Sequence, residues 1–337
     1  MNVPLPPPPP RRPKAWDLPL PPVAAEELAL SDDDGFVFRF AVYGDNQRGV
    51  PIHRRIAENI ARSNATVVLH VGDYVQDGRQ EPQWDEQFAR PAAELLANTI
   101  FLGVQGNHDR NSPRYYDLLR PPGKKPWFRK LVGPVAFFGL DTNLGLKNGS
   151  DQLEWLERAL ARTRRKWKVA FFHEPPYSSS WPWPGGALKT RNTIMPLLEA
   201  AGVDLVFTGH IHNYERFHKD GIPYIITGGG GDTLSKPEQL PNPFRRWTAM
   251  LHHFCTADVY GDRIEVLARD LTGKPFDGLV VRKGSLTEAE VEERKSYEGP
   301  LPQRRPTLGG RNRRRPGKNG AGEAPWGPAT GRGNAGG

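Results

Sequence analysis

The chain has 337 residues and a formal net charge of +8, which is enough length for a sizeable buried core. A single cysteine, Cys255, excludes an intramolecular disulfide and a thiolate metal cluster. No run of about 20 apolar residues is present, and no apolar segment of the secretory type follows the basic residues near the N-terminus. We therefore expect no transmembrane segment and a cytoplasmic protein.

Composition divides the chain into three parts. Residues 1–34 are rich in proline and predict a stiff, disordered tether. Residues 35–285 contain the periodic apolar segments of a folded domain. Residues 286–337 begin with a Glu-rich stretch, Leu286–Lys295, that predicts a short exposed helix, and continue as a disordered Gly, Arg and Pro-rich tail.

Most of the positive charge belongs to this tail. Residues 296–337 contain seven Arg and one Lys against two Glu, so the predicted domain itself is nearly neutral. A basic tail can contact nucleic acid or an anionic surface, or it can simply increase solubility.

The first half of the domain repeats one pattern three times: an apolar strand, a polar tip and, after the first two, a helix. The strands are Phe36–Tyr43, Thr66–Val71 and Ile100–Val104, and the helices follow Pro51 and span about Trp84–Ala97. Because these strands are almost continuously apolar, we expect sheets covered on both faces, with functional residues at the carboxyl ends of the strands.

The second half continues with strands and helices of the same kind. A hairpin at 127–140 precedes a helix capped by Ser150 or Asp151, a strand at Lys168–His173, a helix at Thr190–Ala201 and a strand at Val203–Phe207. Later apolar segments at 222–227, 252–260 and 263–268 predict meandering strands.

The tips of these strands carry residues that can bind metals. They are Asp45, Asp73, Asn107 with His108, His173, and the pair His210 and His212. In an extended segment His210 and His212 project to the same side while Ile211 faces the core. Oxygen and imidazole donors suit manganese, iron or zinc, and their number fits two metal ions that share a carboxylate. Such a pair of ions activates a hydroxide for attack on a phosphate ester.

This order of motifs resembles the calcineurin-like metallophosphoesterases over about residues 36–281. The pattern is Gly-Asp at 44–45 and 72–73, Gly-Asn-His-Asp at 106–109, the lone His173, and Gly-His-Ile-His at 209–212, whose continuation through Arg216 is most similar to the purple-acid-phosphatase branch. The resemblance implies a four-layer α/β/β/α sandwich, in which two mixed β-sheets are flanked by helices.

The resemblance also implies a role for each matching residue. Asp73 bridges both ions, Asp45 and His212 complete one, and Asn107, His173 and His210 complete the other. His108 acts at the substrate phosphate as a leaving-group acid or charge stabiliser, and Asp109 orients it.

The chain departs from the family pattern at two positions. Many members have a histidine where this chain has Gln47, and purple members have a tyrosine where it has Gln76, since Tyr74 is out of register. The ion of Asp45 and His212 is therefore one protein ligand short, and water, Asn46 or Gln47 remain as candidates for that place.

Several other polar residues have ordinary expected roles. His70, His252 and His253 are expected in core or surface positions, and His53 and His218 in solvent. Arg216 is expected to pair with Glu215 or with a backbone carbonyl, and Trp181 and Trp183 to form either a lip over the substrate or a packed loop.

Three functions remain open at this stage. The first is a dinuclear-metal hydrolase of small-molecule or macromolecular phosphate esters, with phosphomonoesters favoured. The second is a phosphodiesterase or nuclease that holds nucleic acid with the basic tail. The third is a non-catalytic scaffold of the same fold, against which the retained ligand set argues. The sequence does not indicate an oligomeric state.

Overall fold

The computed structural model describes residues 35–180, 186–236 and 242–283, and the backbone of residues 289–294. The predicted tether at 1–34, the tail at 296–337 and the tryptophans Trp181 and Trp183 lie outside these residues. Within them, no helix has the length and apolar character needed to cross a lipid bilayer.

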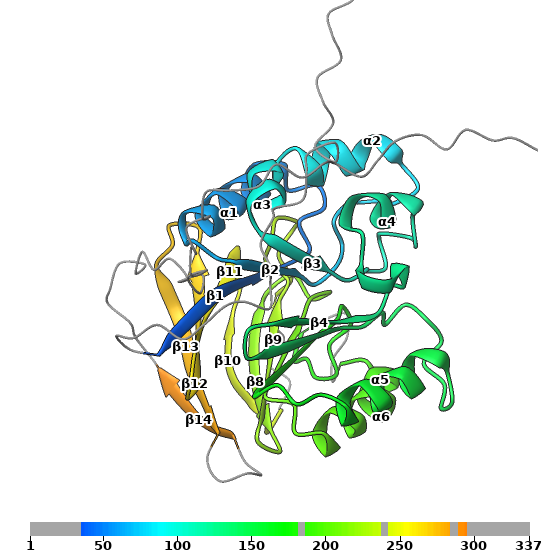
Figure 1. Ribbon diagram of the computed structural model, residues 1–337. Helices are drawn as coiled ribbons and strands as arrows, with labels where there is room; N and C mark the ends of the chain where they lie inside the picture. The colour runs from blue at the N-terminus through cyan, green and yellow to red at the C-terminus, as the bar shows by residue number, and fades with distance from the viewer. Residues whose placement is uncertain (1–34, 181–185, 237–241, 284–288, 295–337) are drawn as a thin grey trace, which may run out of the picture.

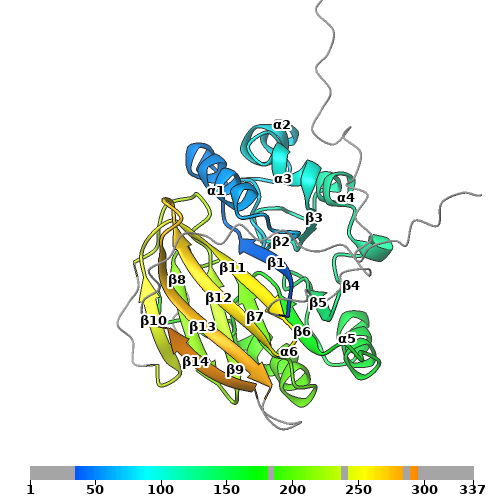
Figure 2. The same cartoon turned by 60° about the vertical axis from the view of Figure 1, so that its left-hand side comes forward.

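Two seven-stranded mixed sheets form the centre of the molecule. The first contains, in spatial order, β14 (Ala289–Arg294), β13 (Pro275–Lys283), β12 (Arg263–Asp270), β11 (His253–Tyr260), β1 (Phe36–Tyr43), β2 (Val67–His70) and β3 (Ile100–Gly103). The second contains β10 (Arg245–Ala249), β8 (Tyr214–Lys219), β9 (Ile222–Thr227), β7 (Leu205–Thr208), β6 (Trp167–Phe171), β5 (Val135–Gly139) and β4 (Phe128–Val132). Figure 2 shows β11 to β14 side by side in the first sheet.

Each sheet contains predicted apolar strands that run parallel to their neighbours. β1, β2 and β3 are mutually parallel neighbours, as are β5, β6 and β7. Every residue of β1 and β2 is buried, which explains why these segments are apolar throughout rather than alternating. The parallel strands bring their carboxyl ends to one edge of each sheet, where the polar tips follow.

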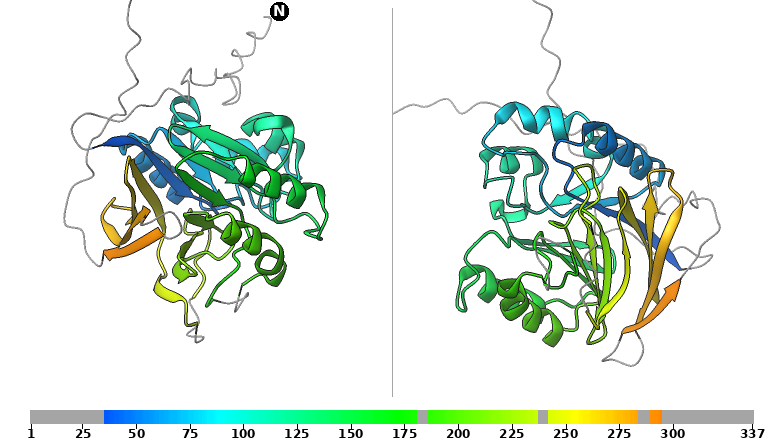
Figure 3. Two further views of the ribbon diagram at one scale, coloured as in Figure 1. Left: turned by 60° about the horizontal axis from the view of Figure 1, so that its bottom comes forward. Right: turned by 180° about the vertical axis from the view of Figure 1, so that it is seen from behind.

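Helices cover the outer face of each sheet, so the predicted four-layer sandwich is confirmed. The helices of the first sheet are α1 (Val50–Arg62), α2 (Glu81–Gln83), the π-helical turn η2 (Trp84–Ala89), α3 (Ala93–Asn98) and α4 (Pro113–Leu119). The second sheet is covered by α5 (Asp151–Ala161) and α6 (Leu188–Ala200), and a short 3₁₀ turn, η3 (Pro122–Lys124), precedes β4. Figures 1 and 3 show these two sets of helices on opposite sides of the sheets.

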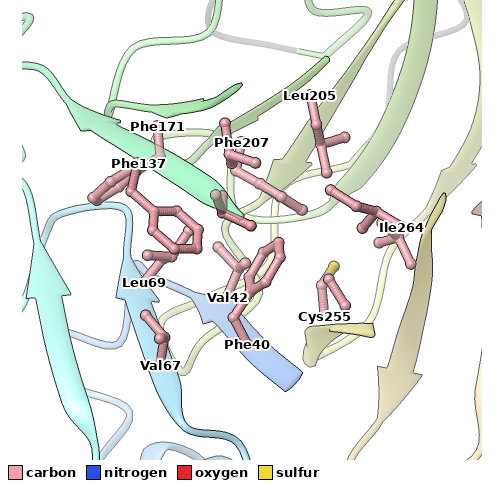
Figure 4. Packing of buried hydrophobic residues seen from close by; sticks show 14 of the residues in the cluster. Phe40, Val42, Val67, Leu69, Phe137, Phe171, Leu205, Phe207, Cys255 and Ile264 are labelled. Atoms are coloured by element: carbon pink, nitrogen blue, oxygen red, sulfur yellow. The ribbon is translucent and has the colours of Figure 1, made fainter. Parts of the chain in front are cut away.

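The main core lies between the two sheets. Phe40 of β1 packs edge-on against Phe137 of β5 and Phe207 of β7, with ring centroids 5.3 and 6.1 Å apart. Figure 4 shows these rings together with Val42 and Leu69 from the first sheet. Burial of aliphatic and aromatic side chains from both sheets ties the layers together and fixes the spacing of their strand ends.

Two predicted helices differ from the structure. The helix expected at Trp84–Ala97 is interrupted between η2 and α3, where Pro91 cannot donate a helical hydrogen bond. The helix expected at Leu286–Lys295 is wrong, because Ala289–Arg294 forms β14 and pairs antiparallel with β13. This segment is the edge strand of the first sheet and extends that sheet beyond residue 285.

A buried ion pair joins β1 to β11 at the middle of the first sheet. Arg39 lies directly opposite Asp258, donates from Nε to Oδ1 at 2.5 Å and from an Nη to Oδ2 at 2.7 Å, and also donates to the Ser63 carbonyl at 2.9 Å. The Arg39 side chain is only 1% exposed. All of its charge is therefore compensated inside the protein.

We expect Asp258→Ala to destabilise the fold by about 3–5 kcal/mol, because it leaves a buried guanidinium without a counter-charge. The double variant Arg39→Met with Asp258→Leu should recover most of this loss, since neither charge then remains buried. Urea denaturation measures both, with Arg62→Met in the exposed pair with Glu58 as a control that changes stability by less than about 0.5 kcal/mol. A double variant as unstable as Asp258→Ala would contradict this account.

Candidate metal centre

The polar residues predicted as ligands meet at the carboxyl ends of five strands. Asp45 follows β1, Asp73 follows β2, Asn107 follows β3, His173 follows β6, and His210 and His212 follow β7. The structure brings the side chains of all six together, as the hydrogen bonds and contacts below show.

The chain turns sharply at three of these positions. Asp45, Asp73 and His210 have φ of +60°, +58° and +70°, in the left-handed region that costs a non-glycine residue about 1–2 kcal/mol. The expectation that His210 and His212 leave an extended segment is therefore wrong: β7 ends at Thr208, and the turn directs the two imidazoles toward different partners.

The first ligand group contains Asp73, His173 and His210. His173 Nε2 lies 3.3 Å from Asp73 Oδ2 and 3.1 Å from Asn107 Oδ1. His210 Nδ1 lies 3.0 Å from Asn107 Oδ1 and 3.1 Å from His173 Nε2. Asn107 thus joins the group, as predicted, and four potential donors converge on one point.

The second group contains Asp45, Asp73 and His212. His212 Nε2 lies 3.6 Å from Asp45 Oδ1, which also accepts a hydrogen bond of 2.8 Å from the backbone N–H of His210. Asp73 is common to both groups. A shared carboxylate of this kind is what the sequence predicted for a pair of ions.

Backbone carbonyls determine which histidine nitrogens are available. His173 Nδ1 lies 2.8 Å from the Val71 carbonyl, and His212 Nδ1 lies 2.9 Å from the Thr233 carbonyl. Because a carbonyl can only accept, each Nδ1 carries the proton and each Nε2 presents a lone pair in the neutral ring. Nε2 is the atom that faces the ligand group in both residues, as in metal sites whose histidines are oriented by outer hydrogen bonds.

Burial and neighbouring charges shift the pKa values of Asp73 and Asp45 in opposite directions. Burial acts to raise the pKa of Asp73, but the charge and hydrogen bond of His173 act against it and hold that pKa well below its usual range. Burial raises the pKa of Asp45 well above its usual range, opposed by His173 and reinforced by the negative charge of Asp73. Two adjacent buried carboxylates repel each other, and a cation between them removes this conflict.

Two further observations indicate that these side chains can hold metal ions. Asp45 Oδ2 is buried and has no hydrogen-bond partner among the described residues. The lone-pair atoms of the first group are 3.0–3.3 Å apart, close to the separation of about 3 Å between two ligands that bind one ion at about 2.1 Å and right angles. Either a proton, as in the hydrogen bonds that these atoms make with one another, or a metal ion can lie between atoms this close.

His108 and Asp109 have different surroundings from those expected. His108 is half-buried beside Asp73, and its ring is held by a 2.7 Å contact from Nδ1 to the Gln76 carbonyl. Asp109 accepts from the backbone N–H groups of Gly106, Asp73 and Tyr74 at 2.7–2.9 Å. The expectation that Asp109 orients His108 is therefore wrong, because its oxygens are engaged in joining two ligand loops.

Gln47, rather than Asn46, is the side chain that contacts the shared carboxylate. Gln47 is buried, and its Nε2 donates to Asp73 Oδ2 at 2.9 Å. Asn46 instead points inward, with Oδ1 2.8 Å from His70 Nε2 and Nδ2 donating to the Tyr74 carbonyl at 2.7 Å. Of the two side chains proposed for this place, only Gln47 reaches the centre.

His70 and Tyr74 belong to the layer beneath the centre. Their rings stack with centroids 3.9 Å apart, so Tyr74 is out of register for a ligand, and the expectation that His70 is a core residue is confirmed. His53, expected in solvent, is buried and contacts the Tyr43 hydroxyl at 3.1 Å and the Gln87 carbonyl at 2.9 Å. Its helical spacing to Ile56 and Ile60 was the available signal for burial.

Arg216 and Glu215 do not pair with each other. Arg216 donates to Asp277 of β13 at 2.7 Å, whereas Glu215 accepts hydrogen bonds from Ser178, Ser179 and Ser180. The carboxylate partner of Arg216 is therefore Asp277 rather than the expected Glu215. These contacts instead tie the two sheets together and attach the loop after His173 to β8.

The calcineurin-like phosphoesterase family model matches residues 38–214. Purple acid phosphatase 21 of Arabidopsis thaliana is 30% identical over 243 residues, which cover 62% of this chain and 55% of that protein. A nucleotide pyrophosphatase/phosphodiesterase of Hordeum vulgare is 25% identical over 280 residues, covering 68% of this chain and 74% of that protein. The chain therefore spans about half the length of the purple acid phosphatases it matches.

The structure of a purple acid phosphatase from yellow lupin (Lupinus luteus) seeds has the same fold. It superposes with a TM-score of 0.66 at 18% identity, over 74% of this chain and 54% of that chain. The family match extends over more than half of the 337 residues and includes the segments that carry every candidate ligand. The chain belongs to the calcineurin-like phosphoesterase family.

Proposed function

We propose that the chain hydrolyses phosphate esters at a dinuclear metal centre, with phosphomonoesters as the favoured substrates. The observation that carries this proposal is the shared carboxylate: Asp73 belongs to two ligand groups, one with Asp45 and His212 and one with His173 and His210. Asn107 completes the second group. Mixed oxygen and imidazole donors suit manganese, iron or zinc.

The chemistry divides between the ions and the side chains. When bound, two such ions supply positive charge for the phosphoryl oxygens and lower the pKa of coordinated water. The protein positions its own groups around them: Nδ1 of His108 donates to the Gln76 carbonyl, so the imidazolium form of this ring can donate a proton or a hydrogen bond from Nε2 to the ester. The Gln47 amide adds a hydrogen bond to the shared carboxylate.

The preference for monoesters is supported by the purple acid phosphatases among the relatives. The Hordeum vulgare relative, named a nucleotide pyrophosphatase/phosphodiesterase, favours diesters or pyrophosphates as the second candidate class. Parallel assays with an aryl phosphate monoester and the corresponding diester decide between them. Equal or greater turnover of the diester would replace the proposed preference.

We expect Asp73→Asn to abolish hydrolysis of both esters and to lower metal occupancy, because a neutral amide bridges two cations poorly. Removing a residue that only hydrogen-bonds to a metal ligand usually lowers metal affinity or activity by about 10–100-fold. Replacing the shared ligand itself should therefore lower activity by more than about 100-fold. Elemental analysis and steady-state assays measure the two effects. Asp220→Asn, at an exposed turn, is the matched control, and full activity of Asp73→Asn would refute the mechanism.

His108→Ala should retain both metals and lose about 10²–10⁴-fold in turnover, the usual contribution of a positioned acid or base. If His108 protonates the leaving group, the loss is larger for an alkyl phosphate than for a nitrophenyl phosphate, whose leaving group needs no proton. An equal loss for both substrates assigns His108 to charge stabilisation. Unchanged turnover would remove it from the reaction.

Gln47→His should tighten binding of the ion at Asp45, Asp73 and His212 by about tenfold, because an imidazole replaces a neutral amide beside that group. Titration of the metal-free protein against a competing chelator measures this directly, without an activity assay. Gln47→Ala is the control and should not gain affinity. Equal affinities in Gln47→His and the parent chain would show that the side chain does not reach this ion.

A further inference from the structure

A cavity lies at the edge of the second sheet, between the start of β4 and α5. Its volume is about 520 Å³, within the range of about 300–1,000 Å³ that is usual for small-molecule sites. Its lining includes Lys125, Trp127, Arg129, Trp155, Arg158 and Arg162 and no acidic residue. None of the candidate metal ligands belongs to it.

The lining combines aromatic surface with positive charge in a fixed arrangement. Trp155 and Arg158 lie three residues apart on α5, and Arg162 follows four residues later at its C-cap in a right-handed helical conformation, which places all three on one face. Two hydrogen bonds fix the Arg129 side chain, which donates to the Thr163 hydroxyl at 3.1 Å and to the Ala159 carbonyl at 3.3 Å. Both tryptophans remain only partly buried.

The positive charge of this cavity is largely uncompensated. Arg158 has an exposed partner, Glu154, at 3.3 Å, a contact that contributes little in water. Within residues 35–180, 186–236 and 242–283, no carboxylate pairs with Lys125, Arg129 or Arg162. Lys125 instead lies 4.9 Å above the ring of Trp127. Cations without counter-charges attract anions, and partly exposed indole rings can stack on other aromatic rings.

We propose that this cavity binds a nucleotide, with the base stacked on an indole ring and the phosphates paired with Arg158 and Arg162. This pairing of an indole ring with arginines is selective, because the ring binds only the base of a nucleotide and the arginines bind only its phosphates. Inorganic phosphate lacks the ring and a nucleoside lacks the charge. The site is separate from the metal centre, so the proposal does not rest on the proposed hydrolytic function.

The test is calorimetric titration of the full metal-loaded chain with the β,γ-methylene analogue of ATP, which resists hydrolysis at that bond. Binding should weaken at least about tenfold in Trp155→Ala and in Arg162→Ala. Adenosine and inorganic tripolyphosphate should each bind at least about tenfold more weakly than the analogue. Thermal unfolding and unchanged ester hydrolysis confirm that the variants are folded.

Two controls separate this site from the alternatives. Arg164→Ala removes an exposed arginine that does not line the cavity, and it should bind the analogue normally. Asp73→Asn should also bind it normally, whereas loss of binding in Asp73→Asn with retention in Trp155→Ala would place the nucleotide at the metal centre. Absence of binding to the parent chain, or equal binding by Trp155→Ala and Arg162→Ala, would overturn the proposal.

Discussion

The burial of the Asp73 carboxylate is the constraint on which the rest of the site depends. One oxygen accepts from the His108 backbone at 2.8 Å, and the other accepts from Gln47 at 2.9 Å and faces His173 at 3.3 Å. A buried carboxylate is tolerated only where donors or cations surround it. Those groups come from three other strand ends, so both sheets must be in place before the carboxylate is stabilised.

The close approach of these strand ends requires an unusual backbone. A Cβ at Gly106 would lie 2.1 Å from Asp73 Oδ1, so only glycine fits beside the shared carboxylate. Asp45, Asp73 and His210 adopt left-handed φ angles that cost free energy. The cost is offset by the packed sheets and by Asp109, whose carboxylate accepts three backbone N–H groups and joins the loops after β2 and β3. Three of the six candidate ligands therefore carry backbone strain.

The strands and their tips could be predicted because each is encoded by neighbouring residues: an apolar run buried on both faces, then a glycine and a polar residue. Contacts between segments far apart in the sequence could not be predicted, because no local pattern encodes them. Nothing near Arg216 indicates that its partner is Asp277, 61 residues away on another sheet. The expected role of Asp109 was wrong for the same reason, since its three donors come from a neighbouring loop and from its own turn. The prediction of a helix at β14 was wrong because the charged residues of this segment repeat with neither the helical nor the strand period.

The two ligand groups differ in chemical character, and this follows from which strands supply them. The group of Asp45, Asp73 and His212 contains two carboxylates and one imidazole, with the Gln47 amide beside it. The group of Asp73, His173 and His210 contains one carboxylate and two imidazoles, with the Asn107 oxygen 3.0–3.1 Å from both rings. Carboxylate-rich sites favour harder cations such as manganese, whereas imidazole-rich sites favour zinc or iron. On the proposed assignment the two metal positions are therefore not equivalent. The position beside Gln47 has fewer nitrogen ligands and more negative charge, so its choice of metal depends more on charge than on nitrogen ligation.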